Sequence, residues 1–266
     1  MRLWSRGFVA MAAAAACADA GVLYQSDFQS GETAGWSTGA TFAADDGKVV
    51  LGVFQTAAVN FAFGPLAPGK YDFAFDFYNI NSWDGNGAFF LGPDTFSFSL
   101  NGVQKVGAAF SNADRPEQTY SPATPFGGGP FSGGTGASGS NELVIHRNSA
   151  IPSYRYRFRR VINHTGGTVA FSCLGTITQT GQYNGFLDEC WALDNAIIQT
   201  HCAADLNGDS FVDDSDFVLF VVGYNILDCA DAMMPAECPA DLNEDGFADD
   251  SDFVLFVGAY NELVCP

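Results

Sequence analysis

The chain has 266 residues, of which 47% are hydrophobic, and it carries a formal net charge of −19 at pH 7. This length is sufficient for one domain with a substantial core and a second, smaller module. The acidity argues against nucleic acid as a partner, because nucleic-acid phosphates need basic side chains to neutralise them.

Residues 1–20 have the pattern of a secretory signal peptide. A positive segment with two arginines precedes an apolar run at 8–16, and an Ala-x-Ala motif at 18–20 has the form of a cleavage site. The run is shorter than the about 20 residues that a membrane-spanning helix needs, and no later run is long enough either. We therefore expect an exported protein, secreted or at the cell surface, that starts near Gly21 and has no transmembrane segment. The alternative for the N-terminus is a lipoprotein signal, with lipid attached at Cys17.

Residues 21–200 show the two-residue periodicity of β-strands. In the segment 71–78, for example, large aromatic residues alternate with small or acidic ones. Because neighbouring side chains of a strand point to opposite faces, this alternation predicts half-buried antiparallel strands. The expected strands cover 48–54, 57–63, 71–78, 95–100, 141–146, 154–161, 167–172 and 191–200. Many short strands without a helical stretch predict a two-sheet sandwich, in particular a jelly roll.

The two ends of this domain carry distinctive residues. It opens with Asp27-Phe-Gln-Ser-Gly-Glu-Thr-Ala-Gly-Trp36 and closes with a strand that contains Asp194 and Asn195. In this respect it resembles the jelly-roll domains of secreted bacterial proteins, including laminin-G-like and carbohydrate-binding modules. In several such modules an acid of the first strand and one of the last hold a structural calcium ion, which implies a calcium site at Asp27 and Asp194. The alternative is that Asp194 and Asn195 satisfy backbone groups at a strand edge.

Two features of the domain suggest glycan contacts. Arg155 and Arg157 lie on one face of a predicted strand, where they could hold an anionic or hydroxyl-rich glycan by bidentate hydrogen bonds. Trp83 lies in a polar turn and is the best candidate for a platform on which a sugar stacks. The alternatives are a solvated outer sheet face for the arginines and a buried core position for the tryptophan. The segment 121–140, rich in Gly, Pro and Ser, is expected to form a long mobile loop over a functional lid, since it has little to bury.

The C-terminal region is a tandem repeat. Residues 205–221 recur almost unchanged at 241–257, and each copy begins with oxygen-bearing side chains at positions 1, 3, 5, 9 and 12 of a twelve-residue loop. This spacing suits a hard cation with six or seven oxygen ligands, so it predicts one calcium ion in each loop. The expected ligands are Asp205, Asn207, Asp209, the carbonyl of Phe211, Asp213 and Asp216 in loop 1, and Asp241, Asn243, Asp245, the carbonyl of Phe247, Asp249 and Asp252 in loop 2.

A helix candidate follows each loop, but prolines leave no room for a helix before the second one. A duplicated loop and helix, closed by Asp at position 12 instead of the Glu of an EF-hand, resembles the type I dockerin domain. The resemblance covers roughly residues 202–265. It implies a calcium-folded module that docks onto a cohesin domain of a partner protein, usually in polysaccharide-degrading assemblies. It also places recognition residues at positions 10 and 11 of each loop, and the predicted contact set is Asp214, Ser215 and Val218 with Asp250, Ser251 and Val254.

Loop 1 departs from this pattern at position 6, where it has Ser210 and loop 2 has Gly246. A residue other than glycine in this sharp turn costs about 1 kcal/mol. Loop 1 is therefore expected to be the weaker site.

Six cysteines follow the leader, an even number that suits disulfides in an exported protein. Cys173 and Cys190 bracket a hairpin-like stretch and are expected to pair, and two buried thiols are the alternative. The repeat cysteines can pair within the repeats (Cys202 with Cys229, Cys238 with Cys265) or across them (Cys202 with Cys265, Cys229 with Cys238). The antiparallel helices implied by the dockerin resemblance favour pairing across the repeats.

The sequence thus predicts a mainly β protein, with an antiparallel jelly-roll sandwich at 21–200 and a small α-helical, calcium-binding, dockerin-like module at 201–266. We find no catalytic motif, and Asp72 and Asp76 are assigned to a polar outer sheet face. The favoured function is a secreted, non-catalytic protein that is glycan-binding or adhesive. Its calcium-dependent module would tether it to a cohesin-type or other surface protein in a polysaccharide-degrading or cell-surface assembly. The alternatives are an extracellular structural protein without a true cohesin partner and a glycoside hydrolase of sandwich fold.

Overall fold

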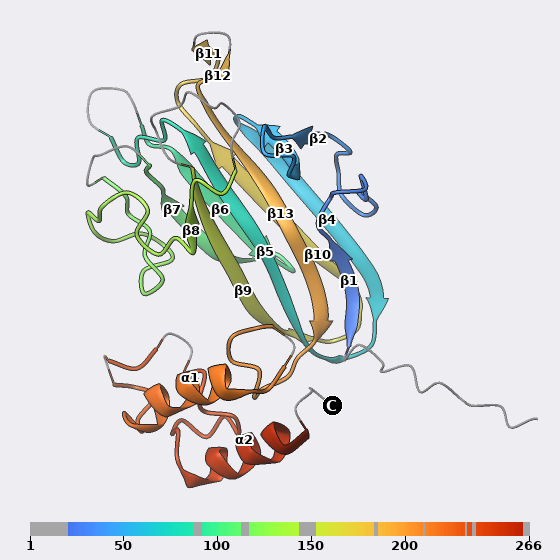
Figure 1. The fold of residues 1–266 in the computed structure, drawn as a ribbon, viewed down its shortest axis with the longest axis vertical. Coiled ribbons are helices and arrows are strands. Elements are labelled where there is room, and N and C mark those ends of the chain that lie inside the picture. Colours follow the sequence, from blue (N-terminus) through green and yellow to red (C-terminus); the bar gives the residue numbers. More distant parts are fainter. Residues whose placement is uncertain are drawn as a thin grey trace, which may run out of the picture.

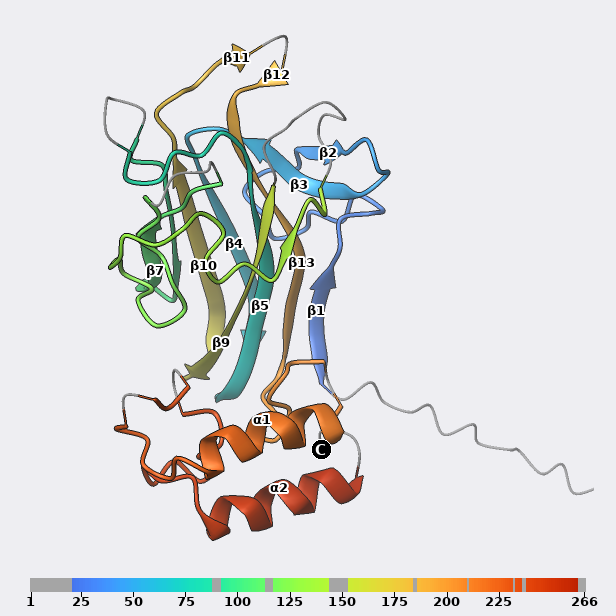
Figure 2. The ribbon, with the colours of Figure 1, turned by 60° about the vertical axis from the view of Figure 1, so that its left-hand side comes forward.

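The computed structural model describes residues 21–87, 92–112, 117–143, 153–183, 186–209, 211–231, 233–235 and 238–262. The strands lie between Val22 and Thr200, and two helices follow between Asp214 and Glu262. The helices lie at one end of the strand domain, opposite the small hairpin of β11 (Gln182–Tyr183) and β12 (Phe186–Leu187) (Figures 1 and 2). The predicted leader at 1–20 lies outside the described residues.

Two antiparallel sheets form the strand domain. The larger has the order β2 (Thr41–Ala43), β3 (Val49–Phe54), β13 (Glu189–Thr200), β5 (Gly69–Asn81), β9 (Tyr154–His164) and β8 (Gly139–Ser140), with β1 (Val22–Ser26) also paired to β13. The smaller has the order β4 (Ala57–Leu66), β10 (Gly167–Thr176), β6 (Thr95–Leu100) and β7 (Val103–Ala109).

The strand order is that of a jelly roll. Along the chain, β3, β4, β5 and β6 alternate between the sheets, and so do β9, β10 and β13. The central orders β3-β13-β5-β9 and β4-β10-β6-β7 are the two four-stranded halves of an eight-stranded jelly roll. The predicted fold class is therefore confirmed, and the two helices that follow agree with a small helical module.

Aromatic side chains fill the space between the sheets. Phe73, Phe75 and Phe77 all point inward from β5, as their alternation predicts, and each is at most 1% exposed. They pack on rings from the opposite sheet, with the ring centroids of Phe77 and Phe96 only 3.9 Å apart. Buried aromatic pairs of this kind add about 0.5–1.5 kcal/mol to the gain from burial alone, so this layer holds the two sheets together.

The structure differs from two expectations, a strand at 141–146 and a mobile loop at 121–140, where it describes these residues. No strand forms at Asn141–Leu143, where Asn141 has a left-handed backbone with φ of 57°. The rest of the expected strand at 141–146 lies outside the described residues. The segment 121–140 forms a series of turns that leads into the two-residue strand β8, instead of a free loop. The buried side chain of Gln118 binds the carbonyls of Tyr120 and Thr135 from inside it. Hydrogen bonds to this amide fix the segment without a large apolar surface.

The predicted disulfide between Cys173 and Cys190 is absent, and both are buried free thiols. Cys173 lies on β10 and points into the core between the sheets, whereas Cys190 lies on β13 and points to the outer face of the other sheet. Trp191, the next residue of β13, takes the inward position. Strand alternation therefore places the two sulfur atoms on opposite sides of a sheet, and closeness in sequence does not bring them together.

Cys229 is bonded to Cys238, with their Cα atoms 5.4 Å apart. This is the short bridge of the pairing across the repeats, and it rules out Cys202 with Cys229. Cys202 is itself disulfide-bonded, but Cys265 lies outside the described residues.

The thiol assignment can be checked chemically. Alkylation of the unfolded, non-reduced protein should label Cys173 and Cys190 and leave Cys229 and Cys238 joined in one peptide pair. The native protein should react much more slowly at both thiols, because burial raises the pKa of each and keeps it protonated. Recovery of a peptide that joins Cys173 to Cys190 would contradict the structure.

Candidate metal centre

Loop 1 folds around its own carboxylates. The position-12 side chain, Asp216, reaches back from the first turn of α1 (Asp214–Tyr224) to accept hydrogen bonds from the backbone N–H groups of Asn207 (2.9 Å) and Asp213 (3.0 Å). Asp205 at position 1 accepts from the N–H groups of Gly208 and Asp209. The oxygens of Asp205, Asp209 and Asp216 come within 4.8 Å of one another.

Loop 2 repeats this arrangement almost bond for bond. Asp252, in the first turn of α2 (Asp250–Glu262), accepts from the N–H groups of Asn243 (3.0 Å) and Asp249 (2.9 Å). Asp241 accepts from the N–H groups of Asp245 and Gly246. The bonds to position 12 are therefore alike in the two loops, whereas those to position 1 come from positions 4 and 5 in loop 1 and from positions 5 and 6 in loop 2. Among the described residues of the two loops, three acids converge within 4.8 Å in loop 1 and not in loop 2.

The donor set fits a calcium ion. Asp205, Asp216 and Asp252 are at most 1% exposed, although residues 201–266 contain fifteen Asp and Glu and no Lys or Arg. Buried carboxylates that face one another need a counter-charge, and an all-oxygen set at this spacing suits calcium. Cys229 also lies near Asp241, but its sulfur is in a disulfide and is not a thiolate ligand. The two calcium ions stay a prediction supported by this geometry.

A pseudo-twofold relation joins the two helices. Tyr224 at the end of α1 donates to Asp250 at the start of α2, and Tyr260 at the end of α2 donates to Asp214 at the start of α1. The helices are therefore antiparallel, as predicted. Phe220 and Phe256 stack between them at 4.9 Å. Asp214 and Asp250 accept these bonds and stay exposed. All six residues of the predicted contact set are therefore exposed: Asp214, Ser215 and Val218 with Asp250, Ser251 and Val254.

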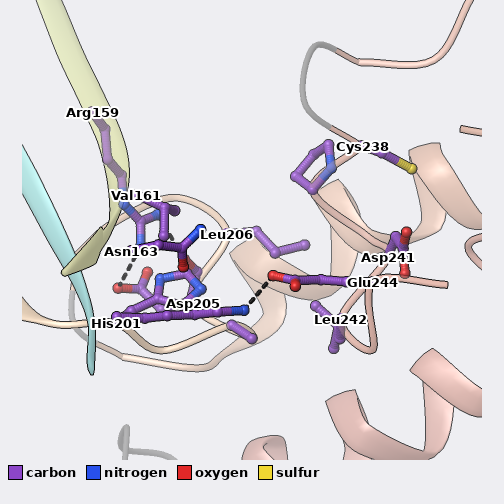
Figure 3. Close-up of a pocket in the computed structure, with 13 residues that line it drawn as sticks. Arg159, Val161, Asn163, His201, Asp205, Leu206, Cys238, Asp241, Leu242 and Glu244 are labelled. Carbon is purple, nitrogen blue, oxygen red and sulfur yellow. Dashed lines mark hydrogen bonds and ion pairs between the residues drawn. The ribbon is translucent and has the colours of Figure 1, made fainter. Parts of the chain in front are cut away.

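The sandwich contacts both C-terminal loops through basic residues. Arg159 of β9 donates to the carbonyl of Asp205 (2.7 Å) and to the carboxylate of Asp72 on β5 (2.7 Å). His201 also binds Asp72, at 3.0 Å. Lys70 forms an ion pair with Glu244 of loop 2. Figure 3 shows the cavity of about 350 Å³ between these groups, with Arg159 and His201 on one side and Asp241 and Glu244 on the other.

These contacts give a different reason to expect weaker calcium binding in loop 1 than in loop 2. Ser210 lies outside the described residues, and position 4 of loop 2 has its own non-glycine residue with positive φ, Glu244 at 64°. The presence or absence of glycine therefore does not decide which loop binds calcium more tightly. The guanidinium of Arg159, however, lies 3.6 Å from a carboxylate oxygen of Asp205, where it repels a cation. Loop 1 is still the expected weaker site, and the charge of Arg159 is the cause.

The predicted calcium pair in the sandwich is incomplete. Asp194 is buried, and its pKa is raised to about 7 by burial and by the negative charges of Asp76 and Asp27, with Lys48 acting in the opposite direction. Among the described residues, no group of three converging acidic, histidine or cysteine ligands includes Asp27 or Asp194. A metal ion at this pair stays an untested prediction.

Among the glycan-binding candidates, the prediction that Trp83 forms a sugar-stacking platform is wrong. Its side chain is fully buried and donates to the carbonyl of Cys190, because the turn that carries it folds over the end of the core. Arg155 and Arg157 both approach Asp76 on the outer face of the larger sheet, and Arg155 also pairs with Glu142. With Gln25 and Asn195 they line an open depression that remains accessible to a ligand.

The residues that join the sandwich to the loops were not identified from the sequence. Strand alternation places Asp72 and Arg159 on the outer face of their sheet, but nothing local shows that this face ends at loop 1. The only local signal is the position of His201, directly between the last strand and the first loop. Among the described residues, no helix is long and apolar enough to cross a membrane.

No protein-family model matches the chain, and no curated protein matches it. Two similar solved structures come from Porphyromonas gingivalis. The K3 cleaved adhesin domain of Lys-gingipain is 10% identical, with 68% of this chain and 99% of that domain covered and a TM-score of 0.37. Dimeric latent PorU is 13% identical, with 57% of this chain covered and a TM-score of 0.31. The match spans 11% of the PorU chain.

Calcium should order both helices. We predict that amides of α1 and α2 in the full chain exchange at least about tenfold faster with chelator than with calcium, because the loop carboxylates repel one another without the ion. Asp216→Asn and Asp252→Asn should each weaken the calcium effect, and Glu262→Gln, an exposed change at the end of α2, should not. Hydrogen exchange followed by mass spectrometry measures this by segment. Equal protection in chelator and calcium would contradict the metal assignment.

The two loops should also differ. Asp241→Ala is expected to reduce the calcium-dependent protection more than Asp205→Ala, since loop 2 has no arginine beside its first ligand among the described residues. Arg159→Gln should bring loop 1 closer to loop 2 in calcium affinity, as measured by calorimetric titration. An unchanged affinity in Arg159→Gln would show that its charge does not weaken the site.

Asp72 should make stability depend on acid pH. Burial alone would raise its pKa, but the bond from His201 and the charge of Arg159 outweigh burial and lower the pKa. Its contribution to the unfolding free energy is therefore full above the usual carboxyl pKa near 4, and it is lost as the pH falls through the lower folded-state pKa. Asp72→Asn should cost about 2 kcal/mol at neutral pH in urea unfolding. The difference from wild type should shrink towards about pH 3, and exposed Glu32→Gln should show neither effect.

Proposed function

We propose that this protein is an exported, non-catalytic β-sandwich that a calcium-dependent, dockerin-like module attaches to a cohesin-type partner protein. The observation that carries the proposal is the duplicated loop and helix, whose two copies repeat the same hydrogen bonds around the same side chains. Export is supported by the leader pattern and by the disulfide Cys229–Cys238, since such bonds persist mainly in oxidising compartments.

The helices offer an apolar surface for the partner. Val218 is 63% exposed and its counterpart Val254 is 70% exposed. Phe217 and Leu219 on α1, and Phe253 and Leu255 on α2, are also at least 40% exposed. The helices bury one face against each other and leave these side chains in water, and an apolar patch of this kind usually marks a partner surface. The pseudo-twofold relation presents the patch twice, so the partner could bind in two orientations related by a half-turn.

The sandwich is the part that the module would deliver. Its outer face combines Arg155 and Arg157 with the acceptors Asp76 and Asn195 in an open depression. This mixture of fixed donors and acceptors suits a hydroxyl-rich glycan better than a strongly anionic one, because Asp76 already offsets the arginine charge. We therefore assign the sandwich an adhesive or glycan-binding role, without an aromatic platform at Trp83.

Binding to type I cohesin domains tests the docking proposal. Immobilised full-length protein should capture a member of a cohesin panel in calcium and release it in chelator, as measured by surface plasmon resonance. Ser215→Gln with Val218→Gln should weaken binding only about twofold, because one of two orientations is lost. The same changes at Ser251 and Val254 should behave alike, and all four together should weaken binding at least about 100-fold.

The substitutions are neutral and tolerated in helices, so they leave the charge of the loops unchanged. A matched control is Val103→Gln, which changes an exposed valine on the sandwich and should have no effect. Complete loss from one repeat alone would refute binding in two orientations. Failure of every cohesin to bind in calcium would refute this class of partner.

A further inference from the structure

Three buried carboxylates meet at the end of the sandwich far from the helices. Asp84 follows β5, Asp94 directly precedes β6, and Glu189 is the first residue of β13. Figure 1 shows that β13 starts beside the β11–β12 hairpin and runs to the opposite end, where the helices lie. The three side chains are 6%, 0% and 0% exposed, and each offers an oxygen within 4.8 Å of the others.

The hydrogen-bond donors to Asp94 and Glu189 are neutral where the structure describes them. Asp94 accepts from the N–H of Asp84 (2.6 Å) and from the N–H and hydroxyl of Thr178 (3.0 and 3.1 Å). Gln179 donates its backbone N–H to Glu189 (2.9 Å) and its side-chain amide to Asp84 (3.0 Å). Among the described residues, neither Asp94 nor Glu189 forms an ion pair with a basic side chain. Neutral donors alone do not compensate the buried negative charge of Asp94 and Glu189.

One oxygen of the cluster has no partner. Oε1 of Glu189 is buried and makes no hydrogen bond among the described residues, although the other carboxylate oxygen of the same side chain does. Further unpartnered buried atoms lie in the adjoining loops, on Asn112 and Glu117. Asn112 is hydrogen-bonded through its backbone to Trp83, and Glu117 to Asn86, so both flank the turn that carries Asp84. Orphaned polar atoms are rare in native proteins and often indicate an ion or water that binds them.

From this geometry we infer a cation site in the sandwich, with Asp84, Asp94 and Glu189 as carboxylate ligands of one calcium ion. The all-oxygen donors favour a hard cation, and three carboxylates from separate parts of the chain suit the flexible coordination of calcium better than the strict octahedron of magnesium. The ion would join the β5–β6 connection to the start of β13. It would thereby stabilise the end of the sandwich opposite the docking module. The site is distinct from the Asp27 and Asp194 pair and from both C-terminal loops.

A bound proton is the alternative way to neutralise the negative charge of this cluster. Burial raises the pKa of Glu189 to about 9, and the charges of Asp94 and Asp84 act in the same direction, so without a cation this side chain would hold a proton at neutral pH. Catalysis is not an alternative use, because a glycosidase places its two carboxyl groups on either side of a bound substrate and these three are buried. An experiment therefore has to separate a bound cation from a bound proton.

Terbium luminescence can make that separation in the full-length protein. Trp83 precedes Asp84, and Trp191 lies two residues after Glu189, whereas residues 201–266 contain no tryptophan. Emission sensitised by tryptophan alone, excited at wavelengths where tyrosine does not absorb, therefore reports on the sandwich and not on the C-terminal loops. We expect saturable terbium emission that excess calcium reverses. Glu189→Gln and Asp94→Asn should each weaken terbium binding at least about tenfold, and Asp194→Asn, another buried acid of β13, should not.

Thermal unfolding of the sandwich, followed by tryptophan fluorescence, gives a second readout. In chelator, Glu189→Gln should be at least as stable as wild type, since the substitution removes a buried acid from the cluster. In calcium, wild type and Asp194→Asn should gain stability and Glu189→Gln should not. Equal calcium stabilisation of wild type and Glu189→Gln, or unchanged terbium emission in both cluster variants, would overturn the site and leave the carboxylates neutralised by protons.

Discussion

Buried carboxylates set the main electrostatic constraint on this protein, because a carboxylate that leaves water must be compensated by a cation, a proton or several hydrogen bonds. The chain has 30 acidic residues and only 11 basic ones, so basic side chains cannot compensate all of them. On the outer face of the larger sheet, Asp72 and Asp76 lie beneath arginines of β9. In loop 1 and at the far end of the sandwich, three acids converge, and we expect metal ions there and in loop 2.

The same constraint explains how the two parts of the chain are joined. Arg159 is shared between Asp72 in the sandwich and Asp205 in loop 1, so one guanidinium compensates acids from both parts. His201 binds the same aspartate, and Lys70 reaches loop 2. Calcium in loop 1 would have to bind beside a fixed positive charge. Cation binding in loop 1 and contact with the sandwich are therefore coupled, and the module is not a freely hinged appendage in this arrangement.

Sequence duplication gives the C-terminal module an internal pseudo-twofold symmetry. The two repeats pack antiparallel through reciprocal bonds between the tyrosine that ends one helix and the aspartate that begins the other. This pairing buries Phe220 and Phe256 and leaves equivalent apolar side chains exposed on both helices. The symmetry is incomplete, since α1 has exposed Val222 where α2 has Gly258. The surface of α1 is therefore somewhat more apolar than that of α2.

The sequence by itself determined whatever depends on local periodicity and spacing. Alternation predicted the inward phenylalanines of β5, because a strand fixes which side chains share a face. The loop spacing predicted which acids of loop 1 come together. Only the tertiary structure decided which distant faces meet. Cys173 and Cys190 are close along the chain but point to opposite sides of a sheet, and Trp83 is buried because its turn folds over the core end. Asp84, Asp94 and Glu189 converge only because the jelly roll brings the ends of β5, β6 and β13 together, and no local pattern encodes that contact.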